Sequence, residues 1–178
     1  TDYFKVHINN KGWITSMKNI TVHPGRELCP ADKPSPLLCL YNTKENKYYL
    51  PQSASYKAAK KELLLTYANG SRATVAVGIK NKKYFKFTLQ SLSPREGIDI
   101  IQWGPVHTNI TNILGGLLGV ARDTSVIVNY AIGLLSLNDV TTGGPATTVG
   151  DIAPFEYLIH SPDTNRFPLP PNLHEGQY

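Results

Sequence analysis

The chain has 178 residues, of which 41% are hydrophobic and 17% are charged. This length can bury a sizeable core without disulfides or metal, and this composition excludes an intrinsically disordered chain. The net charge of +5 is unevenly distributed, because residues 1–95 hold 16 Lys and Arg against 5 acids, whereas residues 96–178 hold 2 against 8.

The lysines of the first half alternate with apolar residues, as in Lys5-Val6-His7-Ile8. Such alternation is typical of strand faces and edges in contact with water. A nucleic-acid surface needs basic residues gathered on one face, so no nucleic-acid partner is expected. The longest nearly apolar stretch, residues 126–137, is shorter than the roughly 18 residues that span a bilayer, so no membrane insertion is expected either.

Two hairpins are predicted in the first fifty residues. Residues 3–9 alternate between apolar and polar side chains, and a turn rich in Asn and Gly leads into a second strand over 13–18. The Pro- and Gly-rich residues 23–36 are expected to form a long loop. Short strands over 37–41 and 48–50 then make the second hairpin.

A three-stranded meander is the clearest prediction, with strands over residues 62–68, 73–79 and 84–92. Asn69-Gly70 predicts a type I′ turn, because both residue types tolerate positive φ, and this turn sets the register of the first two strands. The residues expected to face inward are Leu63, Leu65, Tyr67, Ala73, Val75, Val77, Ile79, Phe85, Phe87 and Leu89.

The last part of the chain adds three predicted elements before residue 140. A strand over 98–103 ends at Gly104-Pro105. Apolar residues between 108 and 119 follow a helical period, which predicts one short helix or helical turn. Residues 126–137 are apolar on both faces and predict a central strand buried on both sides.

A last strand is predicted over residues 155–160, and the Pro-rich residues 165–178 are expected to form a linker toward a further, C-terminal domain. Together these elements predict an all-β domain over residues 1–164. Its architecture is expected to be a large antiparallel β-sandwich with at most one or two short helices.

Cys29 and Cys39 flank a Pro-rich stretch. A disulfide between them would close a short loop in an oxidising compartment, and two buried thiols would serve equally well in a reducing one. The sequence leaves both alternatives open. No His or Cys pair has the spacing of metal ligands, and no Gly-rich cofactor motif is present, so neither metal nor organic cofactor is expected.

No residue is assigned a catalytic role. Glycoside hydrolysis needs two carboxylates that face each other across the scissile bond, and spacing along the chain selects no such pair. The candidate acids are Asp99, Asp123, Asp139, Asp151 and Glu156. A mutarotase-like proton transfer would instead need an acid and a base, which Glu156 with His107 or His160 would supply; ordinary outward-facing polar residues are the alternative.

A carbohydrate-binding site is predicted around Trp103. An aromatic ring can lie under the apolar C–H face of a sugar while neighbouring polar groups bind its hydroxyls. Trp103 ends a predicted strand, and His107, Arg122 and Asp123 follow on the connecting segment, where binding residues tend to lie. The alternative is that Trp103 is a core or domain-contact residue.

Several segments within about residues 60–144 together resemble a known family. They are residues 65–70 (Leu-Thr-Tyr-Ala-Asn-Gly), 84–89 (Tyr-Phe-Lys-Phe-Thr-Leu), 101–105 (Ile-Gln-Trp-Gly-Pro), 118–123 (Leu-Gly-Val-Ala-Arg-Asp), 131–138 (Ala-Ile-Gly-Leu-Leu-Ser-Leu-Asn) and 142–144 (Thr-Gly-Gly). This pattern resembles the N-terminal β-supersandwich domains, similar in fold to galactose mutarotase, of large secreted bacterial proteins classed as glycoside hydrolases.

The resemblance implies a domain that precedes a catalytic domain and packs against it. We therefore expect a non-catalytic accessory domain of a secreted, periplasmic or cell-surface bacterial enzyme that degrades glycans, with the catalytic domain of the same chain and an oligo- or polysaccharide as partners. The alternatives are a stand-alone carbohydrate-binding or adhesin module and a mutarotase-like sugar epimerase. The resemblance carries over no functional residue.

Overall fold

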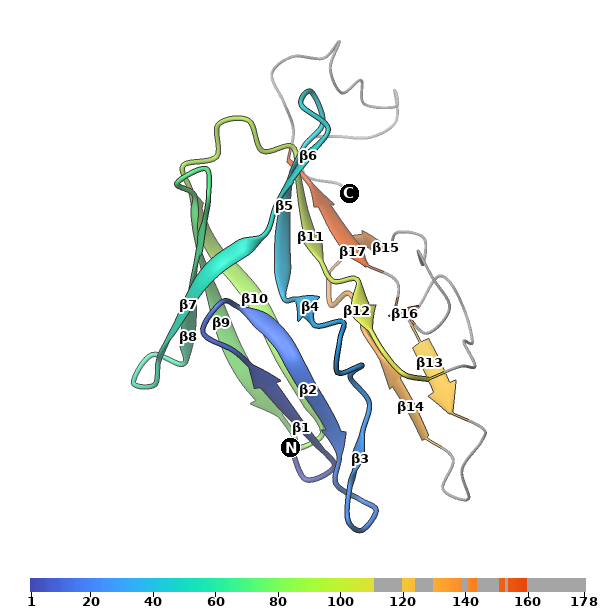
Figure 1. Cartoon of the computed structure of the whole chain (residues 1–178). Coiled ribbons are helices and arrows are strands. Elements are labelled where there is room, and N and C mark those ends of the chain that lie inside the picture. Colours follow the sequence, from blue (N-terminus) through green and yellow to red (C-terminus); the bar gives the residue numbers. More distant parts are fainter. Residues whose placement is uncertain (111–119, 124–129, 139–140, 144–150, 153, 160–178) are drawn as a thin grey trace. The chain divides into compact units, whose positions relative to one another are not determined.

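The computed structural model describes residues 1–110, 120–123, 130–138, 141–143, 151–152 and 154–159 (Figure 1). These residues form seventeen strands and no helix, and every strand pairing among them is antiparallel. The predicted all-β class is therefore confirmed. The chain divides into two compact units, residues 1–37 with 50–95 and residues 38–49 with 96–178.

The first sheet of unit 1 is built on the predicted N-terminal hairpin, which is confirmed. Its strands are β1 (Phe4–Ile8), β2 (Trp13–Asn19), β3 (Arg26–Glu27) and β4 (Ser35–Pro36), with β1, β3 and β4 all paired to β2. The prediction of one long loop over 23–36 was wrong in part, because β3 and β4 interrupt it. Both are only two residues long, too short for an alternating pattern to predict them.

The second sheet of unit 1 is the predicted meander, extended by one strand. Its strands are β7 (Pro51–Lys57), β8 (Glu62–Tyr67), β9 (Arg72–Lys80) and β10 (Tyr84–Ser93), in the order β10-β9-β8-β7. Strand β7 was not predicted, since its residues are mostly polar. Five of its seven residues are exposed, and β7 joins the sheet through its backbone pairing with β8.

The turns of the meander differ from the prediction. Gly70 has a φ of +85°, but Asn69 is not among the residues with positive φ, so the predicted type I′ turn at Asn69-Gly70 was wrong. The two successive positive φ angles occur at Asn81 and Lys82 instead, at +51° and +56°. There the amide of Lys83 donates to the carbonyl of Lys80 at 2.9 Å, which closes a tight turn within the three-residue connection 81–83 between β9 and β10.

The inward face of the meander is buried at one end only. Leu65, Ala73 and Val75 are fully buried, as predicted, whereas Ile79 is 55% exposed, so its predicted burial was wrong. The amide of Val77 donates to the carbonyl of Lys61 at the start of β8, and β9 continues past that point without a β8 residue beside it. The far end of the β9–β10 hairpin is therefore paired on one side only.

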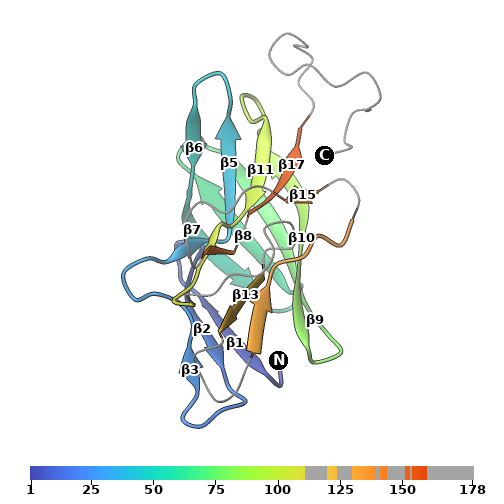
Figure 2. The ribbon, with the colours of Figure 1, turned by 90° about the vertical axis from the view of Figure 1, so that its right-hand side faces the viewer.

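Unit 2 contains a five-stranded sheet in the order β15-β17-β11-β5-β6. Its strands are β5 (Leu38–Asn42), β6 (Lys47–Tyr49), β11 (Ile100–Trp103), β15 (Thr142–Gly143) and β17 (Phe155–Leu158). Figure 2 shows β6, β5, β11 and β17 side by side in this order. Two separate pairs complete the unit: β12 (Val106–His107) with β16 (Asp151–Ile152), and β13 (Val120–Asp123) with β14 (Tyr130–Gly133).

Three predictions concern segments near or beyond the limits of the described residues. The buried strand predicted over 126–137 was wrong, because β14 stops at Gly133 and every residue of 131–137 is exposed or half-buried, with Leu135 and Leu137 exposed. Residues 126–129 lie outside the described residues. So do residues 111–119 of the predicted helix, and residues 160–178, which include the predicted linker.

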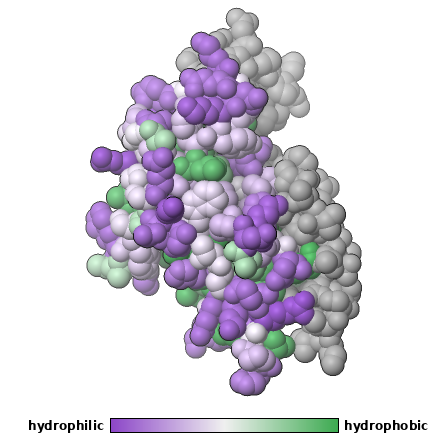
Figure 3. Space-filling view, viewed as in Figure 1, coloured by the Kyte–Doolittle hydropathy of each residue, from purple (hydrophilic) through white to green (hydrophobic). Residues whose placement is uncertain are grey.

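One face of the five-stranded sheet is a hydrophobic core. Leu38 and Leu40 of β5 are fully buried, and Ile101 and Phe155 on the neighbouring strands are buried as well. Successive side chains on a strand point to opposite faces, so the residues between these form the other face of the sheet. The surface visible in Figure 3 is mostly hydrophilic, with small separate hydrophobic areas.

Candidate functional site

The second face of the five-stranded sheet in unit 2 carries polar and aromatic side chains. The β5–β11 and β11–β17 registers place Cys39, Gln102 and Glu156 in one row across three strands. Tyr41 and Tyr48, paired between β5 and β6, lie in the next row on the same face. Rows on one face are two residues apart, roughly 7 Å, so both rows lie within the length of one or two sugar rings.

Two tyrosines provide the aromatic part of this face. The ring centroids of Tyr41 and Tyr48 are 4.4 Å apart with an angle of 36° between the rings. The hydroxyl of Tyr41 donates to the side-chain oxygen of Asn46 at 2.6 Å, which holds its ring in the β5–β6 hairpin. Tyr48 is 51% exposed. The pair therefore offers a fixed aromatic surface of which one ring is open to a ligand.

Gln102 provides an unsatisfied hydrogen-bonding group. Its side chain is only 5% exposed, and its Oε1 atom accepts no hydrogen bond from the residues that the structure describes. Most buried polar atoms in proteins have a partner, and leaving one unpaired costs about 1–3 kcal/mol. A ligand hydroxyl could donate a hydrogen bond to this atom after displacing the groups that cover it.

Glu156 lies directly opposite Gln102 in the β11–β17 pair. Its carboxyl group is half-buried, and this burial raises its pKa above the ordinary value of 4.5. Burial, followed by the charges of Glu156, Tyr41 and Cys39, also raises the pKa of Tyr48. The carboxylate is thus close enough to the tyrosine pair to affect it electrostatically. We call Tyr41, Tyr48, Gln102 and Glu156 the Tyr–Gln face.

Asp99 holds the hairpin that carries the tyrosines. It is buried, and its Oδ2 atom accepts hydrogen bonds of 2.8 Å from both the amide and the hydroxyl of Thr43. Its own amide donates to the carbonyl of Tyr41 at 2.9 Å. Among the carboxylates that the sequence offers for catalysis, Asp99 therefore has a structural role, since its oxygen atoms anchor the β5–β6 turn.

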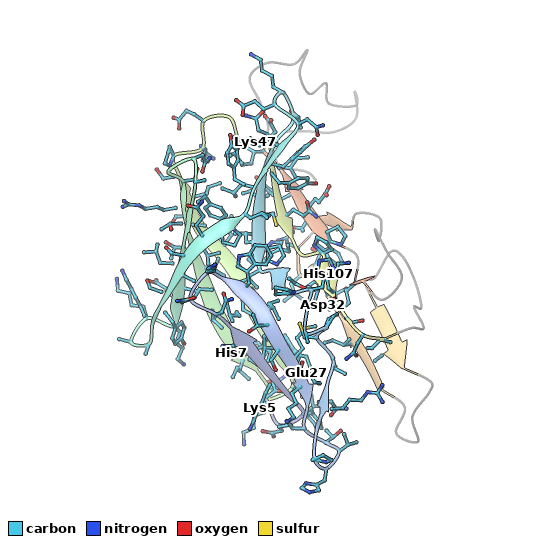
Figure 4. The ribbon with its side chains drawn as sticks, viewed as in Figure 1. Lys5, His7, Glu27, Asp32, Lys47 and His107 are labelled. Atoms are coloured by element: carbon cyan, nitrogen blue, oxygen red, sulfur yellow. The ribbon has the colours of Figure 1, made fainter. Side chains whose placement is uncertain are left out.

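The predicted site around Trp103 is distributed over three strands. Trp103 ends β11, but it points to the face opposite Gln102, where its register partners are Leu38 and Phe155 of the core. Its place among these residues favours the alternative of a core residue. His107, labelled in Figure 4, is half-buried on β12. Its register partner is Asp151 on β16. The remaining two predicted residues, Arg122 and Asp123, lie on β13, and their side chains are outside the described part.

Both cysteines are free and buried. The thiol of Cys29 lies 3.8 Å from the carbonyl oxygen of Ile14, and that of Cys39 lies 3.7 Å from the carbonyl oxygen of Gly104. Burial raises the pKa of Cys39 to about 12, and burial together with the charge of Glu27 raises that of Cys29. Of the two alternatives left open by the sequence, the structure has the two buried thiols.

Sequence reasoning singled out Glu156 as a candidate acid but missed its grouping with the rest of the Tyr–Gln face. Its signal was present in the alternation of residues 38–42, where two leucines point one way and Cys39 and Tyr41 the other. What the chain order does not show is that residue 102, which is 63 positions after Cys39, pairs with it. Register between distant strands comes from tertiary pairing, and local patterns say nothing about it.

Among the described residues, no group of three or more His, Cys, Asp or Glu side chains could hold a metal ion. No helix in the part of the chain that the structure describes is long and apolar enough to cross a membrane. Comparisons with protein-family models, with curated proteins and with solved structures find no match to this chain. The resemblance stated above therefore stays a prediction.

Proposed function

We propose that this chain is a non-catalytic accessory domain that contacts carbohydrate through the Tyr–Gln face, as part of a secreted enzyme that degrades glycans. The observation that carries the glycan contact is the unpartnered Oε1 atom of buried Gln102 in the row beside the Tyr41–Tyr48 pair. The proposal that the chain belongs to a larger enzyme rests on the resemblance of about residues 60–144 to the N-terminal domains of such proteins.

The chemistry of the face suits a sugar. Tyr48 would lie under the apolar C–H face of a pyranose ring, with its own hydroxyl at the rim. Gln102 would accept a hydrogen bond from one sugar hydroxyl, and Glu156 would accept from another when it is ionised. The face needs no metal or cofactor for this contact.

The test is binding of the 178-residue chain to an array of oligosaccharides, followed by titration calorimetry with the glycans that bind. We expect Tyr48→Ala to weaken binding at least five-fold. Tyr3→Ala is the matched control, because Tyr3 is also a tyrosine with 51% exposure but lies in unit 1. Equal loss in both variants, or unchanged binding in Tyr48→Ala, would contradict the proposed site.

A mutarotase-like activity is the second candidate, because burial raises the pKa of Glu156 toward the protonated state that a general acid needs. Polarimetry on freshly dissolved aldoses tests it directly. A rate of anomer exchange above that of buffer, lost in Glu156→Gln, would favour the enzyme over the accessory domain. A rate equal to that of buffer for every aldose would remove this candidate.

A further inference from the structure

Six lysines lie at one end of the meander in unit 1. Lys57, Lys60 and Lys61 are in or next to the β7–β8 turn, and Lys80, Lys82 and Lys83 are in or next to the β9–β10 turn. In an antiparallel meander the first and third turns are at the same end of the sheet, opposite the second turn, as Figure 1 shows. We call these six residues the basic end.

The charge at this end is almost unopposed. All six lysines are exposed. Residues 51–93, which form the whole meander, hold eight Lys and Arg and a single acid, Glu62. One further acid, Asp2, lies beside the β9–β10 turn, because its amide donates to the carbonyl of Lys82 at 2.9 Å. Positive charge of this density attracts polyanions over distances of about 10 Å at moderate salt.

Two exposed tyrosines are adjacent in the sequence to these lysines. Tyr56 directly precedes Lys57, and Tyr84 directly follows Lys83 and pairs with Lys80 in the β9–β10 register. Contiguous exposed apolar surface rimmed by polar residues is typical of interaction sites. Tyr56 is 55% exposed and Tyr84 is 47% exposed. Their strand pairings place them on opposite faces of the sheet, with Tyr56 beside Leu63 on the inner face and Tyr84 beside Lys80 on the outer face.

The two groups of lysines are offset along the strands. Val77 is level with Lys61, because its amide donates to the carbonyl of that residue, and Lys80 lies three residues further along β9. At about 3.3 Å per residue this offset is roughly 10 Å. The basic end is therefore an elongated surface, which suits an extended polymer with repeated negative charges better than a small anion.

We propose that the basic end binds an acidic polysaccharide, one with carboxylate or sulfate groups along its chain. The lysines would contact the anionic groups, and Tyr84, on the same face of the sheet as Lys57 and Lys80, would lie against the apolar face of a sugar ring. All six basic residues are lysines, whose ammonium groups are point charges, whereas arginine is the residue preferred for bidentate contacts with the phosphates and bases of nucleic acids. This site is separate from the Tyr–Gln face and stands even if that face binds no sugar.

The test uses the 178-residue chain and three variants, and we expect all three to keep the fold of the parent chain. The first, Lys57→Gln/Lys60→Gln/Lys83→Gln, avoids Lys61 and Lys82, whose φ angles are positive. The second is Tyr84→Ala. The matched control is a triple variant of exposed lysines elsewhere in the chain, Lys5→Gln/Lys11→Gln/Lys44→Gln, which loses the same net charge.

Binding is measured with heparin and polygalacturonate as acidic glycans, dextran as a neutral glycan, a DNA duplex, and vesicles containing phosphatidylserine. We expect binding to both acidic glycans, no binding to dextran, and at least a five-fold loss of affinity in the basic-end triple variant and in the tyrosine variant but not in the control. Equal loss in the control would show a net-charge effect and overturn the proposal. Tighter binding to DNA or vesicles than to either acidic glycan would also overturn it.

Discussion

Gln102 and Glu156 face each other across the β11–β17 pair, so a buried amide with an unpaired oxygen stands beside a half-buried carboxyl group. Both features cost stability in the free protein. Features that destabilise the free protein tend to occur at functional sites, where ligand binding offsets them. This is the physical reason for assigning a binding role to the Tyr–Gln face.

The first prediction separates stability from binding at Gln102. Replacing Gln102 by Met keeps the shape of the side chain but removes the unpaired oxygen, so we expect the free energy of unfolding in urea to stay the same or rise by about 1 kcal/mol. Glycan binding should fall at least five-fold in the same variant. Gln90→Met, at an exposed position of β10, is the control for adding a thioether. A clear loss of stability in Gln102→Met would mean that Oε1 already has a partner.

The second prediction concerns pH and Glu156. Its pKa in the folded protein is raised by burial, so its ionisation opposes folding. The protein should therefore be relatively more stable below the ordinary pKa of 4.5, and this contribution should be lost as pH rises through the folded pKa. Glu156→Gln should stabilise the protein at pH 7, by less than about 1 kcal/mol because the group is partly exposed, and should have no effect at pH 3.5. Urea unfolding at the two pH values measures the difference; a variant less stable at pH 7 would contradict it.

The third prediction concerns Glu27 of β3, labelled in Figure 4. Burial acts to raise its pKa, but hydrogen bonds from Ser16 and from the amides of Cys29, Met17 and Leu28 outweigh burial, so the pKa is lowered below 4.5. This carboxylate thus stabilises the folded state above pH 4.5, and the contribution is lost as pH falls through the lowered pKa.

Glu27→Gln should therefore destabilise the protein by about 1 kcal/mol at pH 7, a value reduced for the solvent exposure of the side chain. The matched control is Glu96→Gln, since Glu96 is also exposed. The difference between the two variants should be smaller at pH 2 than at pH 7, because protonation of Glu27 removes its charge. Thermal or urea unfolding at both pH values measures it, and a difference undiminished at pH 2 would show that the charge is not the cause.

The fourth prediction compares two glycines with the same backbone conformation. Gly12 and Gly70 both have a φ of +85°, but a Cβ atom at Gly12 would lie 2.7 Å from Leu65 Cδ2 and 3.2 Å from Pro51 Cβ, whereas at Gly70 nothing lies within 4 Å. Gly70→Ala should cost about 1 kcal/mol through backbone strain alone. Gly12→Ala should cost about 1–3 kcal/mol more, because it also overpacks the core. Equal free energies of unfolding for the two variants would contradict the close approach at Gly12.

The fifth prediction concerns the thiols. Burial keeps Cys39 protonated, with a pKa of about 12, and Cys29 is buried with a raised pKa as well. Iodoacetamide at pH 8 should leave both unmodified in the folded protein and modify both in urea without a reductant. Mass spectrometry counts the added groups. A protein that gains none in urea would contain the Cys29–Cys39 disulfide that the sequence left open.

Local patterns in the sequence were sufficient for the all-β class, the N-terminal hairpin and the meander. Alternation with period two identifies strands and their inner faces, and Leu65, Ala73 and Val75 are buried as that rule requires. The rule failed where the strand continues past its neighbours: Ile79 follows the same alternation but is exposed, because no β8 residue lies beside that part of β9. It also missed β7, whose polar residues join the sheet through the backbone.

The sequence by itself determined which segments form strands, because side-chain alternation and turn residues act between near neighbours. Only the tertiary structure decided which strands pair and in which register, and with it the composition of the candidate sites. Trp103 and Gln102 are adjacent in the chain, yet they point to opposite faces of β11, one into the core and one into the Tyr–Gln face. A shift of one residue in that pairing would exchange their roles, and the energy that prevents it comes from burying Leu38, Ile101 and Phe155 together on one side of the sheet.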